Sequence, residues 1–204
     1  EGLKRLRDGC ERGGAKLVPV ASNPLDLVWT NQPAQPLSLV EVHPTEFAGR
    51  SSADKRQEIA RKITDNGVQA VVLTAPDSIA WLLNIRGGDI PNTPIALCFA
   101  VVYQDERVKL FIDTRKLTST LETHLGDGIT VIPLQGFGDS LDQLGGYRMS
   151  VQLSPVSAPA WVIHRLEAAG AKIVRKLDPC VLPKACKNLT ELSGARAAHI
   201  RDGA

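Results

Sequence analysis

Between residues 51 and 176 the chain alternates short apolar runs with segments of helical periodicity. The apolar runs are QAVVLT, IALCFAVVY, VKLFID, GITVIPL, RMSVQL and AKIVRK, and each has the length of a buried strand. Helical segments lie between them, except that only QDER separates the second run from the third, which indicates an antiparallel hairpin. The sequence therefore predicts an α/β fold, with a mixed sheet of about five or six strands and helices on both faces.

Capping signals mark the predicted helices. Ser51 is expected to cap the helix over 51–67, with Asp54 completing a capping box and Ile59 and Ile63 facing inward. In DSIAWLLNI (77–85) either Asp77 or Ser78 is expected to be the cap, and Gly87-Gly88 to end the helix. Helices are also predicted over 114–126, 137–146 and 158–170, the last with Pro159 in its first turn.

The first fifty residues follow a different pattern. A helix in which Leu3 and Leu6 share a face is expected to stop at Gly13-Gly14, before a short strand KLVPV. Four prolines then punctuate residues 21–52 and exclude a long helix. We expect an extended strap there, anchored by its apolar residues Trp29, Val40, Val42 and Phe47.

The end of the chain predicts a helix whose packing partner is absent. Asn188 and Glu191 form a capping box, and apolar residues recur at helical spacing from Leu189 onward. An apolar stripe of this kind needs a surface to cover it. Since the chain also begins without Met, we expect an internal piece of a longer protein; the alternative is a mature chain trimmed by natural processing.

Composition excludes two classes of partner. The 24 basic and 22 acidic residues are interspersed, and aromatic residues make up 4% of the chain, so neither a phosphate-binding surface nor a stacking platform for nucleic acid is expected. No apolar run approaches the roughly 20 residues that a membrane helix needs. We expect no nucleic-acid partner and no membrane partner.

The titratable residues contain no known catalytic pattern. Nucleophile-elbow, phosphate-loop and HExxH motifs are absent, and the four histidines, at 43, 124, 164 and 199, are interpreted as solvated or capping side chains. The four cysteines, at 10, 98, 180 and 186, match no zinc spacing and are interpreted as reduced thiols of a cytosolic protein.

One stretch, PDSIAWLLNIRGGDIPNTP (76–94), combines a capped helix with Arg86, Gly87-Gly88, Asp89 and two further prolines, Pro91 and Pro94. Loops that are constrained by prolines and glycines in this way often present their charged side chains to a ligand or a neighbouring domain. The alternative is that the glycines end a helix while Arg86 and Asp89 pair locally.

Four stretches carry a resemblance to a known family: NPLDLVWTNQP with HPTEFAGRSSADKR, then DSIAWLLNIRGGDIPNTP, VKLFID, and LDPCVLPKACKNLTELSGARAAHIRDGA. Together they resemble the cytosolic three-domain Xaa-Pro aminopeptidases (aminopeptidase P), which belong to the creatinase/prolidase-like "pita-bread" metallopeptidases. The resemblance implies that 1–46 is the end of a first domain plus the strap, 47–184 a creatinase N-terminal-like α/β domain, and 185–204 the first helix of an absent catalytic domain.

The chemistry implied by the resemblance is hydrolysis of the bond between an N-terminal residue and a following proline in short X-Pro peptides. Two Mn²⁺ ions, held by two Asp, one His and two Glu of the catalytic domain, activate a bridging hydroxide. No catalytic residue and no metal ligand carries over to this chain, which alone is expected to be inactive. The parent is expected to be cytoplasmic and homodimeric.

The resemblance also assigns a role to Trp81, Arg86 and Asp89. They match the loop that related enzymes direct towards the active-site cleft, so we expect them to contact substrate, the catalytic domain or a partner subunit. Two alternatives stay open: a stand-alone interaction module, and the accessory domain of a prolidase or creatinase relative.

Overall fold

The computed structural model describes residues 2–20 and 22–203, which fall into two units, one ending at Pro36 and the other running from Leu37 onward. The division of the chain into domains at residues 46 and 184 stays a prediction.

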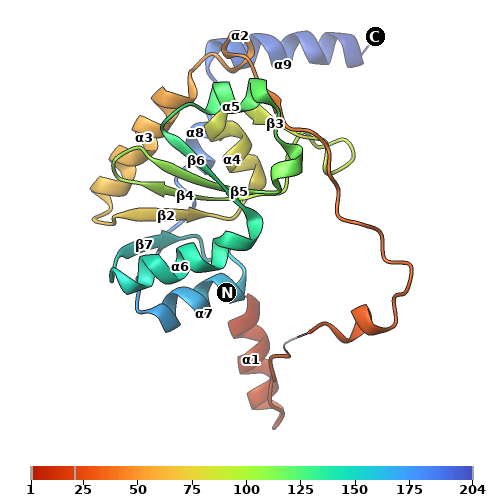
Figure 1. The fold of residues 1–204 in the computed structure, drawn as a ribbon, viewed down its shortest axis with the longest axis vertical. Helices are drawn as coiled ribbons and strands as arrows, with labels where there is room; N and C mark the ends of the chain where they lie inside the picture. The colour runs from red at the N-terminus through yellow and green to blue at the C-terminus, as the bar shows by residue number, and fades with distance from the viewer. Residues whose placement is uncertain (1, 21, 204) are drawn as a thin grey trace. The chain divides into compact units, whose positions relative to one another are not determined.

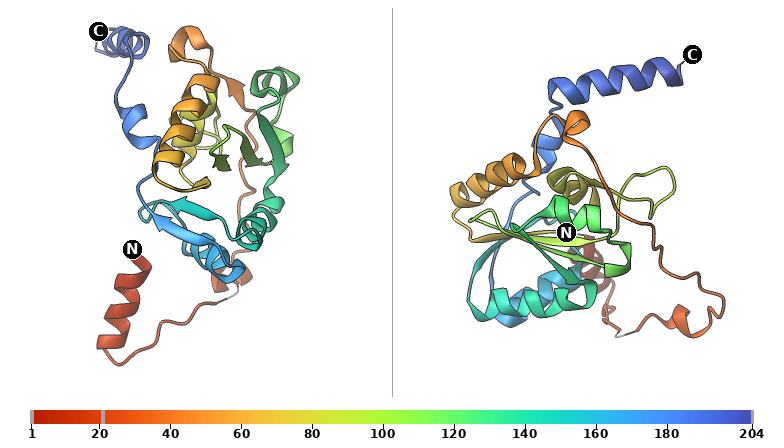
Figure 2. Two further views of the ribbon diagram at one scale, coloured as in Figure 1. Left: turned by 90° about the vertical axis from the view of Figure 1, so that its left-hand side faces the viewer. Right: turned by 45° about the horizontal axis from the view of Figure 1, so that its top comes forward.

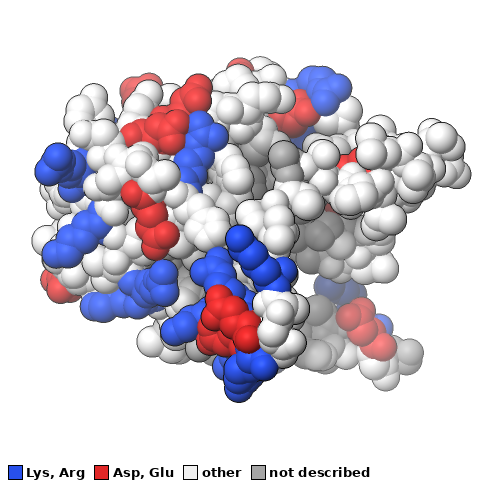
Figure 3. Space-filling model, turned by 90° about the horizontal axis from the view of Figure 1, so that it is seen from below, with Lys and Arg blue, Asp and Glu red and all other residues white. Residues whose placement is uncertain are grey.

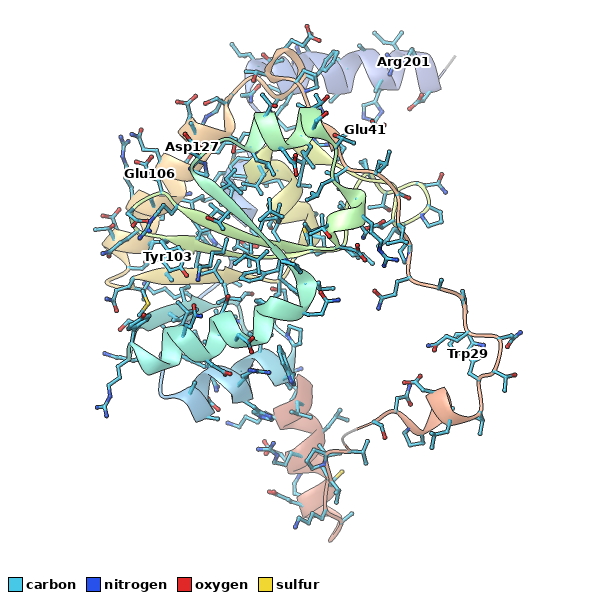
Figure 4. The ribbon with its side chains drawn as sticks, in the orientation of Figure 1. Trp29, Glu41, Tyr103, Glu106, Asp127 and Arg201 are labelled. Atoms are coloured by element: carbon cyan, nitrogen blue, oxygen red, sulfur yellow. The ribbon has the colours of Figure 1, made fainter. Side chains whose placement is uncertain are left out.

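The first unit contains helix α1 (Gly2–Arg12) and the 3-10 turn η1 (Pro24–Leu27). As predicted, α1 ends at Gly13-Gly14, where Gly14 has a φ of +72°. The predicted strand KLVPV is wrong, because residues 16–20 pair with no other strand and a lone strand leaves its backbone groups without ladder partners. Trp29 is 49% exposed (Figure 4), and its anchoring role stays a prediction.

The second unit is built on a six-stranded mixed sheet with the order β6-β5-β4-β2-β7-β8 (Figure 1). Its strands are β2 (Ala70–Leu73), β4 (Phe99–Tyr103), β5 (Val108–Ile112), β6 (Ile129–Pro133), β7 (Ser150–Leu153) and β8 (Lys172–Arg175). Strand β4 runs antiparallel to both β2 and β5, and the other neighbours are parallel. The β4–β5 hairpin closes over residues 104–107, as QDER predicted.

Helices cover both faces of this sheet (Figure 1). One face packs against α3 (Ser52–Asp65), α4 (Pro76–Leu83) and α5 (Ser119–Leu125), and the other against α6 (Phe137–Gly146) and α7 (Ala160–Ala169). Alternate residues of β2 point to opposite faces, so Val71 and Leu73 lie in the first core and Ala70 and Val72 in the second. The predicted fold class is confirmed.

Helix α3 follows the sequence prediction closely. The Ser51 hydroxyl accepts the N–H of Asp54 at 3.1 Å, and Ile59 and Ile63 are fully buried. The 3-10 turns η2 (Thr114–Lys116) and η3 (Leu134–Gly136) precede α5 and α6. The single helix predicted over 114–126 is therefore divided, because Leu117 and Thr118 are extended and Thr118 caps α5.

The region after β2 differs most from the prediction. Helix α4 begins at Pro76 with Ala75 as cap residue, so neither Asp77 nor Ser78 caps it. It ends at Asn84, which is left-handed with a φ of 52°, rather than at Gly87-Gly88. Asparagine tolerates this conformation better than most residues, which is why the chain can turn sharply there.

The turn at Asn84 leads into β3 (Ile85–Arg86), which the sequence analysis missed. Strand β3 pairs antiparallel with β1 (Glu41–Val42) of the strap. Val40 is buried and Val42 packs against the core, which confirms both as anchors. Phe47 lies on the one-turn helix α2 (Thr45–Ala48) and is 60% exposed, so the expectation that it anchors the strap is wrong.

The chain ends in α8 (Val181–Ala185), which was not predicted, and α9 (Leu189–Asp202), which was. The capping box of Asn188 and Glu191 is present, as predicted. No described residue of α9 is buried, and Leu189 and Ile200 are 86% and 75% exposed. Helix α9 extends beyond the α/β layers, and only its start lies beside α2 (Figure 2).

Gly49 ends α2 and lies against Asn188 at the start of α9. It has a φ of +68°, and a Cβ there would collide with the Asn188 side chain, which caps α9 and donates to the Ala48 carbonyl at 2.9 Å. Gly67 has nearly the same φ, +67°, but a Cβ there meets nothing within 4 Å. Alanine at Gly67 would therefore cause backbone strain alone, whereas alanine at Gly49 would cause the same strain and a collision with Asn188.

We predict that Gly67→Ala lowers the free energy of unfolding by about 1–2 kcal/mol, the cost of a left-handed alanine. Gly49→Ala should cost about 2–3 kcal/mol, because it adds the loss of a helix cap to the same strain. Urea denaturation of the two variants measures the difference. Equal costs would show that Gly49 does not constrain Asn188.

Candidate functional site

A groove of about 580 Å³ lies between α4 and the start of α9 in the second unit. Its walls come from four segments: the strap and α2, the α4–β3 corner, the loop after β3, and the α8–α9 region. The lining residues are His43, Phe47, Asp77, Ala80, Trp81, Arg86, Thr93, Pro94, Ile95, Lys184, Lys187, Glu191, Gly194 and Ala195.

Trp81 and Arg86 reach this groove from the two sides of the Asn84 turn. Trp81 lies on the last turn of α4, and Arg86 follows the buried Ile85 in β3. Successive side chains of a strand point in opposite directions, so burial of Ile85 directs Arg86 away from the core. The structure thus brings two of the three predicted site residues together.

Among the described residues the Arg86 guanidinium is hydrogen-bonded to backbone carbonyls alone. Its Nη1 donates to the carbonyls of Ile85 at 2.8 Å and Ala80 at 3.3 Å. Within the described residues no ion pair joins Arg86 to a carboxylate. Burial lowers the pKa of Arg86, and the charge of Glu191 opposes that shift.

A buried lysine supports Trp81 from below. The Nζ of Lys55 lies 4.6 Å from the centre of the indole ring and donates to the Trp81 carbonyl at 3.0 Å and to Asn84 Oδ1 at 2.7 Å. Only 1% of Lys55 is exposed. Burial lowers the pKa of Lys55 to about 8, against an opposing effect of Glu191. The sequence contains one indication that Lys55 is buried: it lies four residues before the inward-facing Ile59, and residues four apart share a face of a helix.

Two further titratable groups face the groove. Glu191 Oε2 accepts the N–H of Asn188 at 2.9 Å, which completes the cap of α9. Burial, followed by the charges of Arg86 and Lys55, lowers the pKa of His43 below 6.5, so this imidazole is neutral at pH 7. His43 also stacks loosely on Phe47, at 6.1 Å between ring centres.

Asp89 does not line the groove. Its Oδ2 accepts the N–H of Leu97 at 2.7 Å and the ammonium of Lys116 at 2.5 Å, with both side chains of the ion pair buried. The hypothesis that Arg86 and Asp89 pair locally is therefore wrong. The partner of Asp89 is Lys116, from η2, which sequence reasoning missed because nothing in the local pattern links positions 27 residues apart.

Asp89 instead holds the loop that forms one wall of the groove. The contacts to Leu97 and Lys116 fix the two ends of residues 89–97, and Thr93, Pro94 and Ile95 of this loop are lining residues. The role of Asp89 in the geometry is to support that wall.

The described residues offer no metal centre and no membrane-spanning helix. Among residues 2–20 and 22–203 no group of three or more His, Cys, Asp and Glu side chains could hold a metal ion. The donor set present does not fit the manganese pair that the resemblance implies. No helix in this part of the chain is long and apolar enough to cross a bilayer. On the face in Figure 3, basic and acidic side chains are intermingled.

The chain matches a family model described as the creatinase/prolidase N-terminal domain over residues 31–191. A probable Xaa-Pro aminopeptidase P of Coccidioides posadasii (strain C735) is 35% identical over 98% of this chain and 32% of that protein. The protein of the same name from Penicillium rubens is 33% identical over 100% of this chain and 34% of its own length. The chain thus spans about a third of the length of these curated relatives.

The fold also matches a solved structure. An X-prolyl aminopeptidase from Caenorhabditis elegans, a cytosolic enzyme with a di-nuclear active site, superposes with a TM-score of 0.88. The identity is 24%, and the match covers 98% of this chain and 33% of the other. At this identity the likeness shows the fold alone.

We predict strong coupling between Asp89 and Lys116. Asp89→Asn or Lys116→Met should each lower the free energy of unfolding by about 3–5 kcal/mol, because each leaves one buried charge unpaired. The double variant should cost clearly less than the sum. Arg165 and Asp142, an exposed pair at 2.7 Å, provide the control cycle, in which the two costs should be nearly additive because solvent screens the pair. Additive costs at Asp89 and Lys116 in urea denaturation would contradict the buried pair.

We also predict an alkaline stabilisation that depends on Lys55. Below pH 8 this lysine is charged in both the folded and the unfolded state. Between pH 8 and about 10.4 the folded state has lost the proton while the unfolded state still holds it, so the free energy of unfolding rises with pH. The rise attributable to Lys55 should be about 2 kcal/mol. It should be missing in Lys55→Met and present in Lys62→Met, a change on the same helix. Equal rises in all three proteins would contradict the assignment.

Proposed function

The chain belongs to the creatinase/prolidase N-terminal domain family, and from this membership we propose that it is the non-catalytic N-terminal part of a metal-dependent Xaa-Pro aminopeptidase. The observation that carries the proposal is the 35% identity to the Coccidioides protein across nearly the whole chain, matching only a third of that protein. The remaining two thirds of such a parent would carry the catalysis.

Metal chemistry belongs to that other part of the parent. A pair of metal ions, Mn²⁺ by resemblance, would activate the attacking water there. The described residues of this chain hold no ligand set for it, so the chain alone is proposed to be inactive. The C. elegans structure, with its di-nuclear site, is consistent with metal use in the parent.

The domain plan follows the same likeness. Residues 1–46 would be the end of a preceding domain plus the strap, 47–184 the creatinase N-terminal-like domain, and 185–204 the start of the catalytic domain. The exposure of α9 along its described length supports the last assignment, because a helix without a covering surface is incomplete by itself. A cytosolic location of the parent is proposed from the C. elegans relative.

Within the parent, the groove would flank the active-site cleft. Trp81 and Arg86 would contact the substrate, the catalytic domain or a partner subunit of a homodimer. Asp89 would act through the loop that it holds. The support is geometric: Trp81 and Arg86 share a groove with α9, the element that leads towards the proposed catalytic domain.

The proposal is tested with the full reading frame that contains this chain. Purified with Mn²⁺, that protein should release the N-terminal residue from X-Pro peptides and leave X-Ala peptides intact. The 204-residue chain should release nothing under the same conditions. Release by the short chain, or none by the long one, would refute the proposal.

We predict that Arg86→Ala in the full-length protein lowers kcat/KM for an X-Pro peptide about tenfold or dissociates the dimer, since either role removes one charged contact. Arg56→Ala is the matched control. Arg56 also donates to a backbone carbonyl, that of Glu106, but lies outside the groove. Peptide hydrolysis and light scattering measure the two outcomes, and identical behaviour of both variants would leave Arg86 with a structural role only.

A further inference from the structure

The groove carries cationic charge that the described residues do not neutralise. Three cationic side chains and two carboxylates line it. Asp77 is paired with Lys184, and Glu191 is committed to the cap of α9. Arg86 and Lys187 have no ion-pair partner among the described residues, and the buried ammonium of Lys55 lies beneath Trp81.

The unused donors of Arg86 form one edge of its guanidinium. Nη1 donates both hydrogen bonds, to the carbonyls of Ile85 and Ala80. The N–H groups of Nε and Nη2 have no acceptor in the part of the chain that the structure describes. These two atoms lie on the same side of the planar group and form a fork whose geometry matches the two oxygens of a carboxylate.

Arg86 is half-buried and has no direct ion pair among the described residues, although the charge of Glu191 acts on it from across the groove. Taking a charge out of water is normally offset by a partner of opposite sign. Burial lowers the pKa of Arg86, and the charge of Glu191 only partly opposes that effect. An anion from outside the described residues would restore the balance.

The rest of the groove favours an anion with an apolar body. Phe47, Trp81, Pro94 and Ile95 provide apolar surface beside the arginine. The volume of about 580 Å³ lies in the range of small-ligand sites, roughly 300–1,000 Å³. A free phosphate or acetate ion would use the charge and leave this apolar wall uncovered.

We infer that the groove binds the C-terminal carboxylate of a short peptide through the Nε and Nη2 edge of Arg86, with an apolar last residue packed against Trp81 and Ile95. The inference rests on the proposed function only in taking a peptide as the carrier of the carboxylate. Arg86 and Trp81 would then recognise the end of the peptide opposite to the one that an aminopeptidase cleaves.

The experiment is calorimetric titration of the 204-residue chain with Ala-Pro-Phe and with its C-terminal amide. The two ligands differ only in the charge that Arg86 would bind. The free acid should bind about 10- to 100-fold more tightly, as expected for a charge-assisted hydrogen-bonded pair. Arg86→Gln should abolish this difference. Arg56→Gln should keep it, since Arg56 lies on α3 and donates to the carbonyl of Glu106 (labelled in Figure 4), outside the groove.

Arg86→Lys is the second variant, because it keeps a cation in the groove if Arg86→Gln unfolds. It should lose most of the acid–amide difference, since an ammonium lacks the planar fork. Equal affinities of acid and amide for the original chain, no binding of either, or a difference that survives in both Arg86 variants would overturn the inference. Displacement of the peptide by equimolar acetate would overturn it too, since only a free-anion site would remain.

The outcome is separable from that of the proposed function. If the full-length protein cleaves no X-Pro peptide but the acid–amide difference depends on Arg86, the proposed function fails and the carboxylate site stands. If cleavage occurs but the acid and the amide bind equally, the proposed function stands and the carboxylate site is refuted.

Discussion

Asn84 joins separate segments of the second unit through its side chain and its backbone. Its Oδ1 accepts the buried ammonium of Lys55, its Nδ2 donates to the Arg50 carbonyl at 2.8 Å, and its own carbonyl accepts the N–H of His43 at 2.8 Å. With the left-handed φ of 52°, these bonds end α4 and start β3 within one residue. The groove depends on this turn, because it places Trp81 and Arg86 on the same wall.

The remaining walls are supported by contacts between distant parts of the chain. The buried pair of Asp89 and Lys116 holds the loop after β3, and Asn188 ties the start of α9 to α2. Each contact links residues far apart in sequence, so the groove forms only when the second unit is folded. The rigid α/β layers thus position a groove whose lining comes mostly from loops and helix ends and combines charged with apolar side chains.

The sequence predicted the layers far better than the groove. Apolar runs identify strands such as β2 and helices such as α3 because several residues of each run give the same signal of burial. The α4–β3 corner has no such redundancy: one left-handed asparagine decides it, and the two residues of β3 are too short a pattern to recognise. Lys55 and Lys116 read as ordinary surface lysines until their partners, 29 and 27 residues away, are known. The stretch 76–94 was nevertheless the right place to look, since it supplies four groove residues from α4 and β3 and most of the loop that forms a wall.

The central claim is that the second unit carries a groove built to hold the end of a peptide beside the cleft of an Xaa-Pro aminopeptidase. The most direct measurement is a crystal structure of the full-length protein with a short X-Pro peptide bound. The account predicts the peptide's C-terminal carboxylate within about 3 Å of Nε and Nη2 of Arg86. A peptide that ends elsewhere, with Arg86 paired to an acidic side chain of the protein itself, would contradict it.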